Sequence, residues 1–98
     1  MHINIATAPV SWGVLMKDTP NVPPYGQVLD EIKEAGYTGT ELGPFGYLPL
    51  DIAKVKEELE ARSLKLISAF TIYNMVEGKK DAQVYEEAVT TAKTLSAL

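Results

Sequence analysis

Hydrophobic and polar positions follow two different periods along the chain, and each change of period marks a new element. The segment from His2 to Ala8 carries isoleucine at positions 3 and 5, an alternation that is typical of a strand. From about Tyr25 to Ala35 the apolar residues recur at the spacing of one helix face, which predicts a helix. Gly36 then stands where a helix commonly ends in the left-handed conformation. A short second strand is predicted from Gly39 to Leu42.

The second half of the chain continues the alternation. Asp51 is predicted to cap a helix that ends near Arg62, because its carboxylate can accept hydrogen bonds from the free amides of a first turn. Leu64 to Tyr73 is almost continuously apolar, which is typical of a strand buried on both faces of a parallel sheet. Asp81 is predicted to cap a third helix. The order βαβαβα indicates an α/β fold whose parallel strands are joined by right-handed crossovers.

Three parallel strands alone make an incomplete sheet. They leave at least one edge and one face poorly covered, and no further strand follows the third predicted helix. We therefore expect residues 1–98 to form a single domain that is the opening portion of a larger α/β fold.

Composition and charge exclude several classes of function. The formal charge is -4, and no block of Lys or Arg is present, whereas nucleic-acid and anionic membrane surfaces attract clustered basic residues. The chain has no cysteine, which excludes disulfides and thiolate sites. No apolar run approaches the ~18 residues of a membrane span, and no basic region precedes the first apolar stretch as in a secretory signal. We expect a soluble cytoplasmic protein without a nucleic-acid or membrane partner.

Candidate binding residues follow the predicted strands, because ligands of parallel α/β sheets bind beyond the carboxyl ends of the strands. Ser11 and Trp12 follow the first strand, Glu41 ends the second, and Phe70 lies near the end of the third. Polar side chains beside aromatic side chains are typical of a small-molecule pocket. For each aromatic taken alone, however, packing in the core is the simpler interpretation.

Glu41 allows two interpretations. It could accept a hydrogen bond from a substrate hydroxyl or act as an acid or base in a cleft. Alternatively, it could be a strand-end carboxylate that bonds neighbouring backbone amides or pairs with a lysine, since a buried carboxylate needs such partners.

Other chemical motifs are absent from the sequence. Gly39, Gly43 and Gly46 do not form the dinucleotide-binding pattern. The one histidine, His2, is expected at the opposite edge of the sheet, so no serine has a catalytic partner. A metal site needs several converging ligands, and Glu41 is the single candidate. No catalytic residue is therefore assigned, and no metal site is expected within this chain alone.

Three segments carry a resemblance to a known family: IATAPVSWG (5–13), AGYTGTELGPFGYLP (35–49) and LEARSLKLISAF (59–70). The sequence resembles the N-terminal part of the sugar isomerase/epimerase-like (xylose isomerase-like) TIM barrels, and most closely inosose dehydratase-type proteins of inositol catabolism. The resemblance covers nearly the whole chain. One departure is Ser63, where relatives often have glycine.

The resemblance implies that the chain forms the first three βα units of a (β/α)₈ TIM barrel, a fold of about 250 residues. The complete enzyme would be a lyase or isomerase that binds a polyol or sugar substrate, a ketose or an inosose. It would use a divalent metal, manganese or cobalt, held by residues on later strands. The pocket wall carries over to this chain as Ser11, Trp12, Glu41 and, more weakly, Phe70.

A second hypothesis comes from the incomplete sheet. The chain could be a non-catalytic α/β module, such as a flavodoxin-like arrangement or an engineered partial barrel. Such a module would self-associate through its exposed sheet edges.

Overall fold

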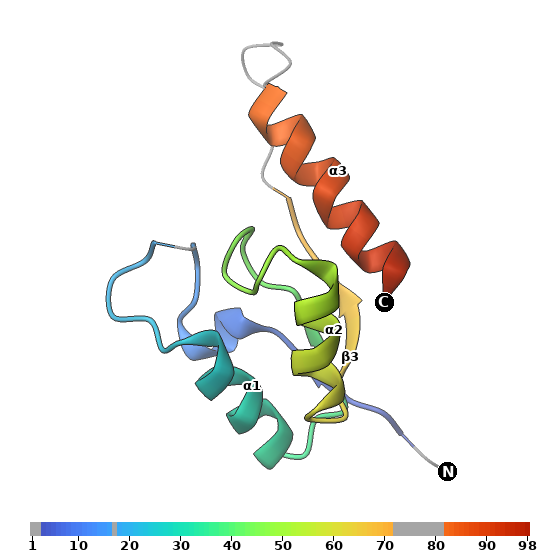
Figure 1. Cartoon of the computed structure of the whole chain (residues 1–98). Coiled ribbons are helices and arrows are strands. Elements are labelled where there is room, and N and C mark those ends of the chain that lie inside the picture. Colours follow the sequence, from blue (N-terminus) through green and yellow to red (C-terminus); the bar gives the residue numbers. More distant parts are fainter. Residues whose placement is uncertain (1–2, 17, 72–81) are drawn as a thin grey trace.

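The described chain forms one parallel sheet with helices, which confirms the predicted α/β class and element order (Figure 1). The computed structural model describes residues 3–16, 18–71 and 82–98. Its elements are β1 (Ala6–Thr7), a short 3₁₀ helix η1 (Pro9–Trp12), α1 (Tyr25–Glu34), β2 (Gly39–Glu41), α2 (Ile52–Glu60), β3 (Lys65–Ser68) and α3 (Ala82–Ala97).

The sheet has the order β1-β2-β3, and both neighbouring pairs are parallel. Helices α1 and α2 lie side by side against one face of it (Figure 1). Their apolar stripes meet the buried residues of the strands and loops, because this is the way each element removes its hydrophobic side from water. The core consists of Val14, Val28, Leu29, Ile32, Leu42, Leu48, Val55, Leu59 and Leu64.

The end of α1 has the geometry predicted from Gly36. This glycine has a φ of 97°, a left-handed conformation that costs a residue without Cβ little. Its amide donates to the carbonyl of Lys33 at 3.0 Å, and the amide of Tyr37 donates to the carbonyl of Ile32 at 3.2 Å. These two bonds satisfy helix-end carbonyls in the Schellman arrangement.

Helix α2 begins as predicted and ends two residues earlier than expected, at Glu60. The amide of Ala53 donates to Asp51 Oδ1 at 3.1 Å, so Asp51 is the N-cap. At the other end Ser63 occupies the left-handed position with a φ of 55°. Because Ser63 has a Cβ, this conformation costs roughly 1 kcal/mol relative to glycine.

The first strand is much shorter than predicted. The prediction covered His2 to Ala8, whereas β1 holds Ala6 and Thr7; His2 lies outside the described residues. Ile3 and Ile5 are 68% and 57% exposed. The physical reason is that β1 is an edge strand with a neighbour on one side only, and the turn at Pro9 ends it.

The third strand is also shorter than predicted, and it is not buried on both faces. It ends at Ser68, and Ile67 is 55% exposed, whereas Leu66 packs against the core. The helices cover the Leu66 face, while Ile67 lies over Gly39 on a face that no layer of the described chain covers. Residues 72–81, with Tyr73 and the predicted cap Asp81, lie outside the described part.

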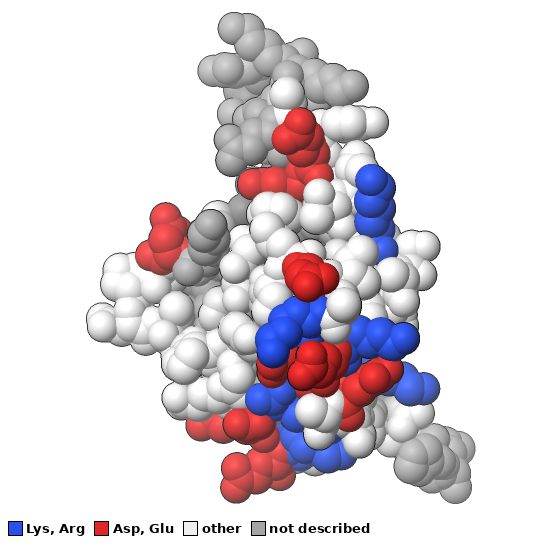
Figure 2. All heavy atoms as spheres, in the orientation of Figure 1, with Lys and Arg blue, Asp and Glu red and all other residues white. Residues whose placement is uncertain are grey.

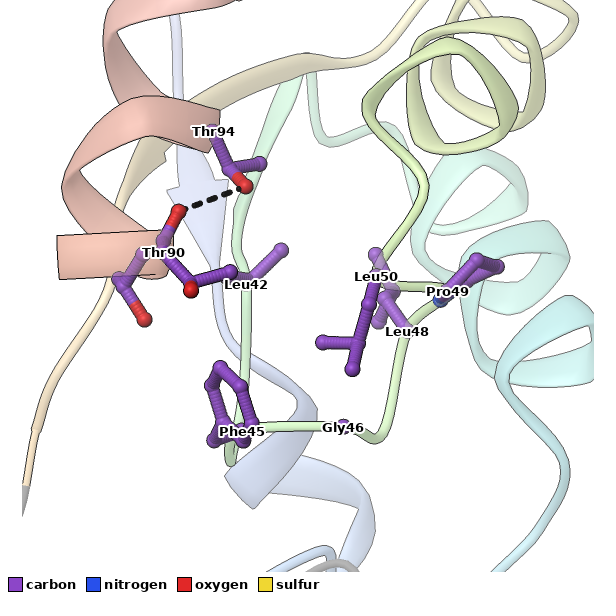
Figure 3. A pocket seen from close by; sticks show the side chains of 9 residues that line it. Leu42, Phe45, Gly46, Leu48, Pro49, Leu50, Thr90 and Thr94 are labelled. Atoms are coloured by element: carbon purple, nitrogen blue, oxygen red, sulfur yellow. Dashed lines mark hydrogen bonds between the residues drawn. The ribbon is translucent and has the colours of Figure 1, made fainter. Parts of the chain in front are cut away.

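Helix α3 lies beside β3 and packs against the segment from Leu42 to Leu50 (Figures 1 and 3). Thr91 and Thr94 of α3 are buried. The Thr94 hydroxyl donates to the carbonyl of Thr90 at 3.0 Å, which satisfies its hydrogen-bonding need away from water. The space left in this contact is about 10 Å³, enough for no more than about one water molecule. This contact is therefore packing rather than a ligand site.

Candidate functional site

Glu41 ends the central strand of the sheet, at the edge where ligands of parallel sheets bind. Gly39 and Thr40 before it are buried, whereas Glu41 itself is half-buried. Thr40 is paired with Thr7 of β1, and Glu41 is paired with Ser68 of β3. Glu41 thus ends the strand that lies between β1 and β3.

The carboxylate of Glu41 is held by a serine hydroxyl. Ser68 Oγ donates to Glu41 Oε1 at 2.7 Å, in a partly buried position. Within the described residues, no backbone amide and no lysine bonds this carboxylate. The structure therefore shows neither the backbone amide nor the lysine that was expected as a partner if Glu41 had only a structural role. Sequence reasoning did not select Ser68; its place at the end of the neighbouring strand is the signal that could have found it.

Ser11 and Trp12 lie in η1, directly after β1 and at the same edge of the sheet. Ser11 is exposed, and its Oγ lies 3.4 Å from Thr7 Oγ1. Trp12 is half-buried and packs against the core, in agreement with the simpler interpretation of this aromatic. In the described part of the chain, no hydrogen bond joins either residue to Glu41. Their role in a pocket wall stays a prediction.

Phe70 follows β3 by two residues and is 43% exposed. An aromatic ring that is exposed to this extent is not a core residue, since its apolar surface meets water. Its position at the carboxyl edge is compatible with the predicted wall.

The loop after β2 is tied to both preceding loops. Gly43 has a φ of 81°, and a Cβ at this position would lie 3.0 Å from Pro9 Cγ. The hydroxyl of Tyr47 donates to the carbonyl of Pro23 at 2.6 Å, and burial raises the pKa of this phenol. These contacts fix the loop that borders Glu41, so the edge of the sheet has a defined shape.

Charged residues elsewhere form mixed surfaces. On the face drawn in Figure 2, Lys and Arg are interspersed with Asp and Glu over α2, and a small group of acidic side chains lies at the end of α1. Among the described residues, no group of three or more His, Cys, Asp or Glu side chains is placed to hold a metal ion. In the same part of the chain, no helix has the length and apolar character needed to cross a membrane.

Three known proteins are similar in sequence to this chain. The chain is 36% identical over 86 residues to the rhizopine catabolism protein MocC of Rhizobium meliloti, covering 85% of this chain and 25% of that protein. It is 30% identical over 88 residues to the inosose dehydratase of Glaesserella parasuis serovar 5 (strain SH0165), covering 87% of this chain and 28% of the relative. The inosose dehydratase of Histophilus somni (strain 129Pt) is 28% identical over 86 residues, covering 85% of this chain and 28% of the relative.

The matches span most of this chain but only part of each relative. No family model matches the chain, and no solved structure does. The chain spans about a quarter of the length of the curated relatives it matches. Over most of its own length, the chain is similar in sequence to two inosose dehydratases and to the MocC protein.

Proposed function

We propose that the chain is the N-terminal portion of a (β/α)₈ barrel enzyme, and that the carboxyl edge of its sheet binds a polyol-derived ketone such as an inosose. The observation that carries the proposal is the carboxylate of Glu41 at the end of the central strand, with one oxygen held by Ser68. The similarity to two inosose dehydratases over 85% and 87% of the chain supports the substrate class.

The residues at this edge suit a hydroxyl-rich ring. The second oxygen of Glu41 can accept a hydrogen bond from a ring hydroxyl, and a bond to a charged acceptor is stronger than one between neutral groups. Ser11 offers an exposed hydroxyl that can donate or accept. Trp12 and Phe70 supply apolar surface for the C–H face of the ring, and this combination is typical of small-molecule sites.

A divalent metal, manganese or cobalt, would polarise the carbonyl of the substrate in the complete enzyme. The residues present do not fit such an ion, because the described chain brings no cluster of metal-ligating side chains together. The contribution of this chain is therefore substrate binding. We expect the purified 98-residue chain with added Mn²⁺ to give no measurable dehydration of an inosose.

Titration of the isotopically labelled chain with an inosose, followed by NMR, tests the binding proposal. We expect amide shifts confined to the carboxyl edge, at Glu41, Leu42 and Ser68, with a weak, roughly millimolar affinity because the site is partial. Glu41→Gln keeps the shape and removes the charge, so it should weaken binding. The matched control is Glu57→Gln, which changes an exposed glutamate of α2.

Two outcomes would contradict the proposal. One is an absence of shifts at the carboxyl edge at saturating inosose. The other is equal binding by Glu41→Gln and Glu57→Gln. Dehydration by the chain alone would contradict the assignment of the metal ligands to another part of a longer protein.

A second candidate is a non-catalytic module that associates with further copies of itself. The observation that favours it is the open face of the sheet, on which Ile67 is 55% exposed, together with exposed Ile3 and Ile5 before the edge strand β1. Exposed apolar surface next to an unpaired strand edge favours pairing. In the barrel proposal, further strands of a longer chain would cover the same surface.

A further inference from the structure

The pairing of β2 with β3 is irregular at the point where Glu41 lies. Gly39 pairs with Lys65 and Thr40 with Leu66, but Glu41 then pairs with Ser68 instead of Ile67. One residue of β3, Ile67, is therefore extra at this position. In a regular ladder Ile67 would stand opposite Glu41, because partners advance one by one along two parallel strands.

This β-bulge changes which side chain meets the carboxylate. A shift of one residue moves a side chain to the other face of a sheet, and bulges often re-aim side chains next to functional sites. Here the shift brings a hydroxyl, rather than an isoleucine, to 2.7 Å from Glu41 Oε1.

Backbone bonds fix the same two residues. The amide of Leu42 donates to the carbonyl of Ser68 at 2.9 Å, so the strand end beside Glu41 is tied to Ser68 through the main chain as well. On the other side, the hydroxyl of Thr40 donates to the carbonyl of Glu41 at 2.9 Å. These bonds hold the backbone around Glu41, and the bond to Oε1 restricts the orientation of its carboxylate.

We propose that Ser68 is a positioning residue for Glu41, brought into place by the bulge at Ile67. Its hydroxyl engages Oε1 and leaves Oε2 directed to a ligand that carries a hydroxyl donor. Fixing the carboxylate in advance lowers the entropy lost when the ligand binds. The geometric part stands independently, whereas the ligand part rests on the proposed function.

Two readouts on the 98-residue chain test this role. The first is the side-chain ¹³Cδ resonance and χ-angle populations of Glu41, which report the hydrogen bond directly. We expect Ser68→Ala to shift the resonance and broaden the populations, and Ser68→Thr to restore both because it keeps the hydroxyl. Ser96→Ala, which alters an exposed serine of α3, is the matched control and should leave Glu41 unchanged.

The second readout is the affinity for an inosose, measured in parallel with the fold checked by circular dichroism. The loss of one positioning hydrogen bond predicts about fivefold weaker binding by Ser68→Ala, with recovery in Ser68→Thr. If Glu41 is unchanged in Ser68→Ala, the positioning role is overturned. It is also overturned if the resonance shifts while a measurable inosose affinity stays the same. If the wild-type chain binds no inosose but the resonance shifts as expected, the proposed function fails and the geometric role stands.

Discussion

Arg62 Nε donates to Asp30 Oδ1 at 2.6 Å, so the residue just beyond α2 is bonded to the middle of α1. The same guanidinium donates from Nη1 to the side chain of Glu58 at 2.9 Å and to its backbone carbonyl at 2.8 Å. It also reaches the carbonyl of Gly26 at 3.4 Å. The Arg62 side chain is 17% exposed, which makes it a clamp between two helices rather than a surface charge.

Replacement of this clamp should loosen the contact between α1 and α2. We expect Arg62→Ala to lower the free energy of unfolding by about 2 kcal/mol, since it removes several charged hydrogen bonds and the packing of the side-chain stem. Asp30 is 66% exposed, and solvent screens its half of the pair, so Asp30→Ala should cost only about 0.5 kcal/mol. Urea denaturation followed by circular dichroism measures both changes.

The matched control is Lys56→Ala. Lys56 and Glu60 are 4.0 Å apart and both well exposed, so this change should stay within about 0.5 kcal/mol of the wild type. An equal loss in Arg62→Ala and Lys56→Ala would show that Arg62 does not act as a clamp.

The stability of the chain should fall in acid partly through Glu58. Hydrogen bonds from Arg62 and Lys54 lower the pKa of this carboxyl in the folded state. A lowered folded-state pKa means that the unfolded state binds protons more readily. The stabilisation is therefore complete above the ordinary glutamate pKa of about 4.3 and is lost as the pH falls through the folded value.

Unfolding measurements between neutral pH and the acid range check this linkage. Glu58→Gln should show a shallower decline of stability in acid than the wild type, because its side chain does not titrate. Glu34→Gln is the control, since Glu34 is exposed and has no ion pair within the described residues. A decline in Glu58→Gln as steep as that of the wild type would refute the assignment.

Gly43 is required for two reasons, and a pair of variants separates them. Its φ of 81° is left-handed, and a Cβ would lie 3.0 Å from Pro9 Cγ. Gly36 has a similar φ of 97° but no atom within 4 Å of an added Cβ. Gly36→Ala should therefore cost about 1 kcal/mol from the backbone alone. Gly43→Ala should cost about 1 kcal/mol more, from the added contact with Pro9.

Thermal and urea denaturation of the two variants give the difference directly. Equal destabilisation of Gly43→Ala and Gly36→Ala would mean that Pro9 moves aside without cost. In that case the loop after β2 would not be tied to η1 as the structure indicates.

The features that the sequence predicted well depend on local chemistry. Asp51 caps α2 and Gly36 ends α1 because both effects act within one helical turn. Each of these interactions could be predicted because the residues that form it are close together in the sequence.

The features that the sequence did not predict depend on distant partners. Asp30 lies 32 positions from Arg62, and Ser68 lies 27 positions from Glu41. The bulge at Ile67 has no sequence signature, and it decides which side chain meets the carboxylate. The lengths of β1 and β3 were overestimated because hydrophobicity does not reveal whether a neighbouring layer is present to cover a strand.

The open face of the sheet predicts association of the isolated chain. Ile67 projects from this face over Gly39 and is 55% exposed, so Ile67→Lys should place a charge where a second copy would pack. In sedimentation velocity, we expect the wild type to form dimers or larger species as its concentration rises and Ile67→Lys to stay monomeric. Leu15→Lys changes a residue of similar exposure, 60%, in the loop after η1, and it should associate like the wild type. A wild type that stays monomeric, or an equal effect of both lysines, would contradict association through the sheet and leave the barrel proposal as the account of this surface.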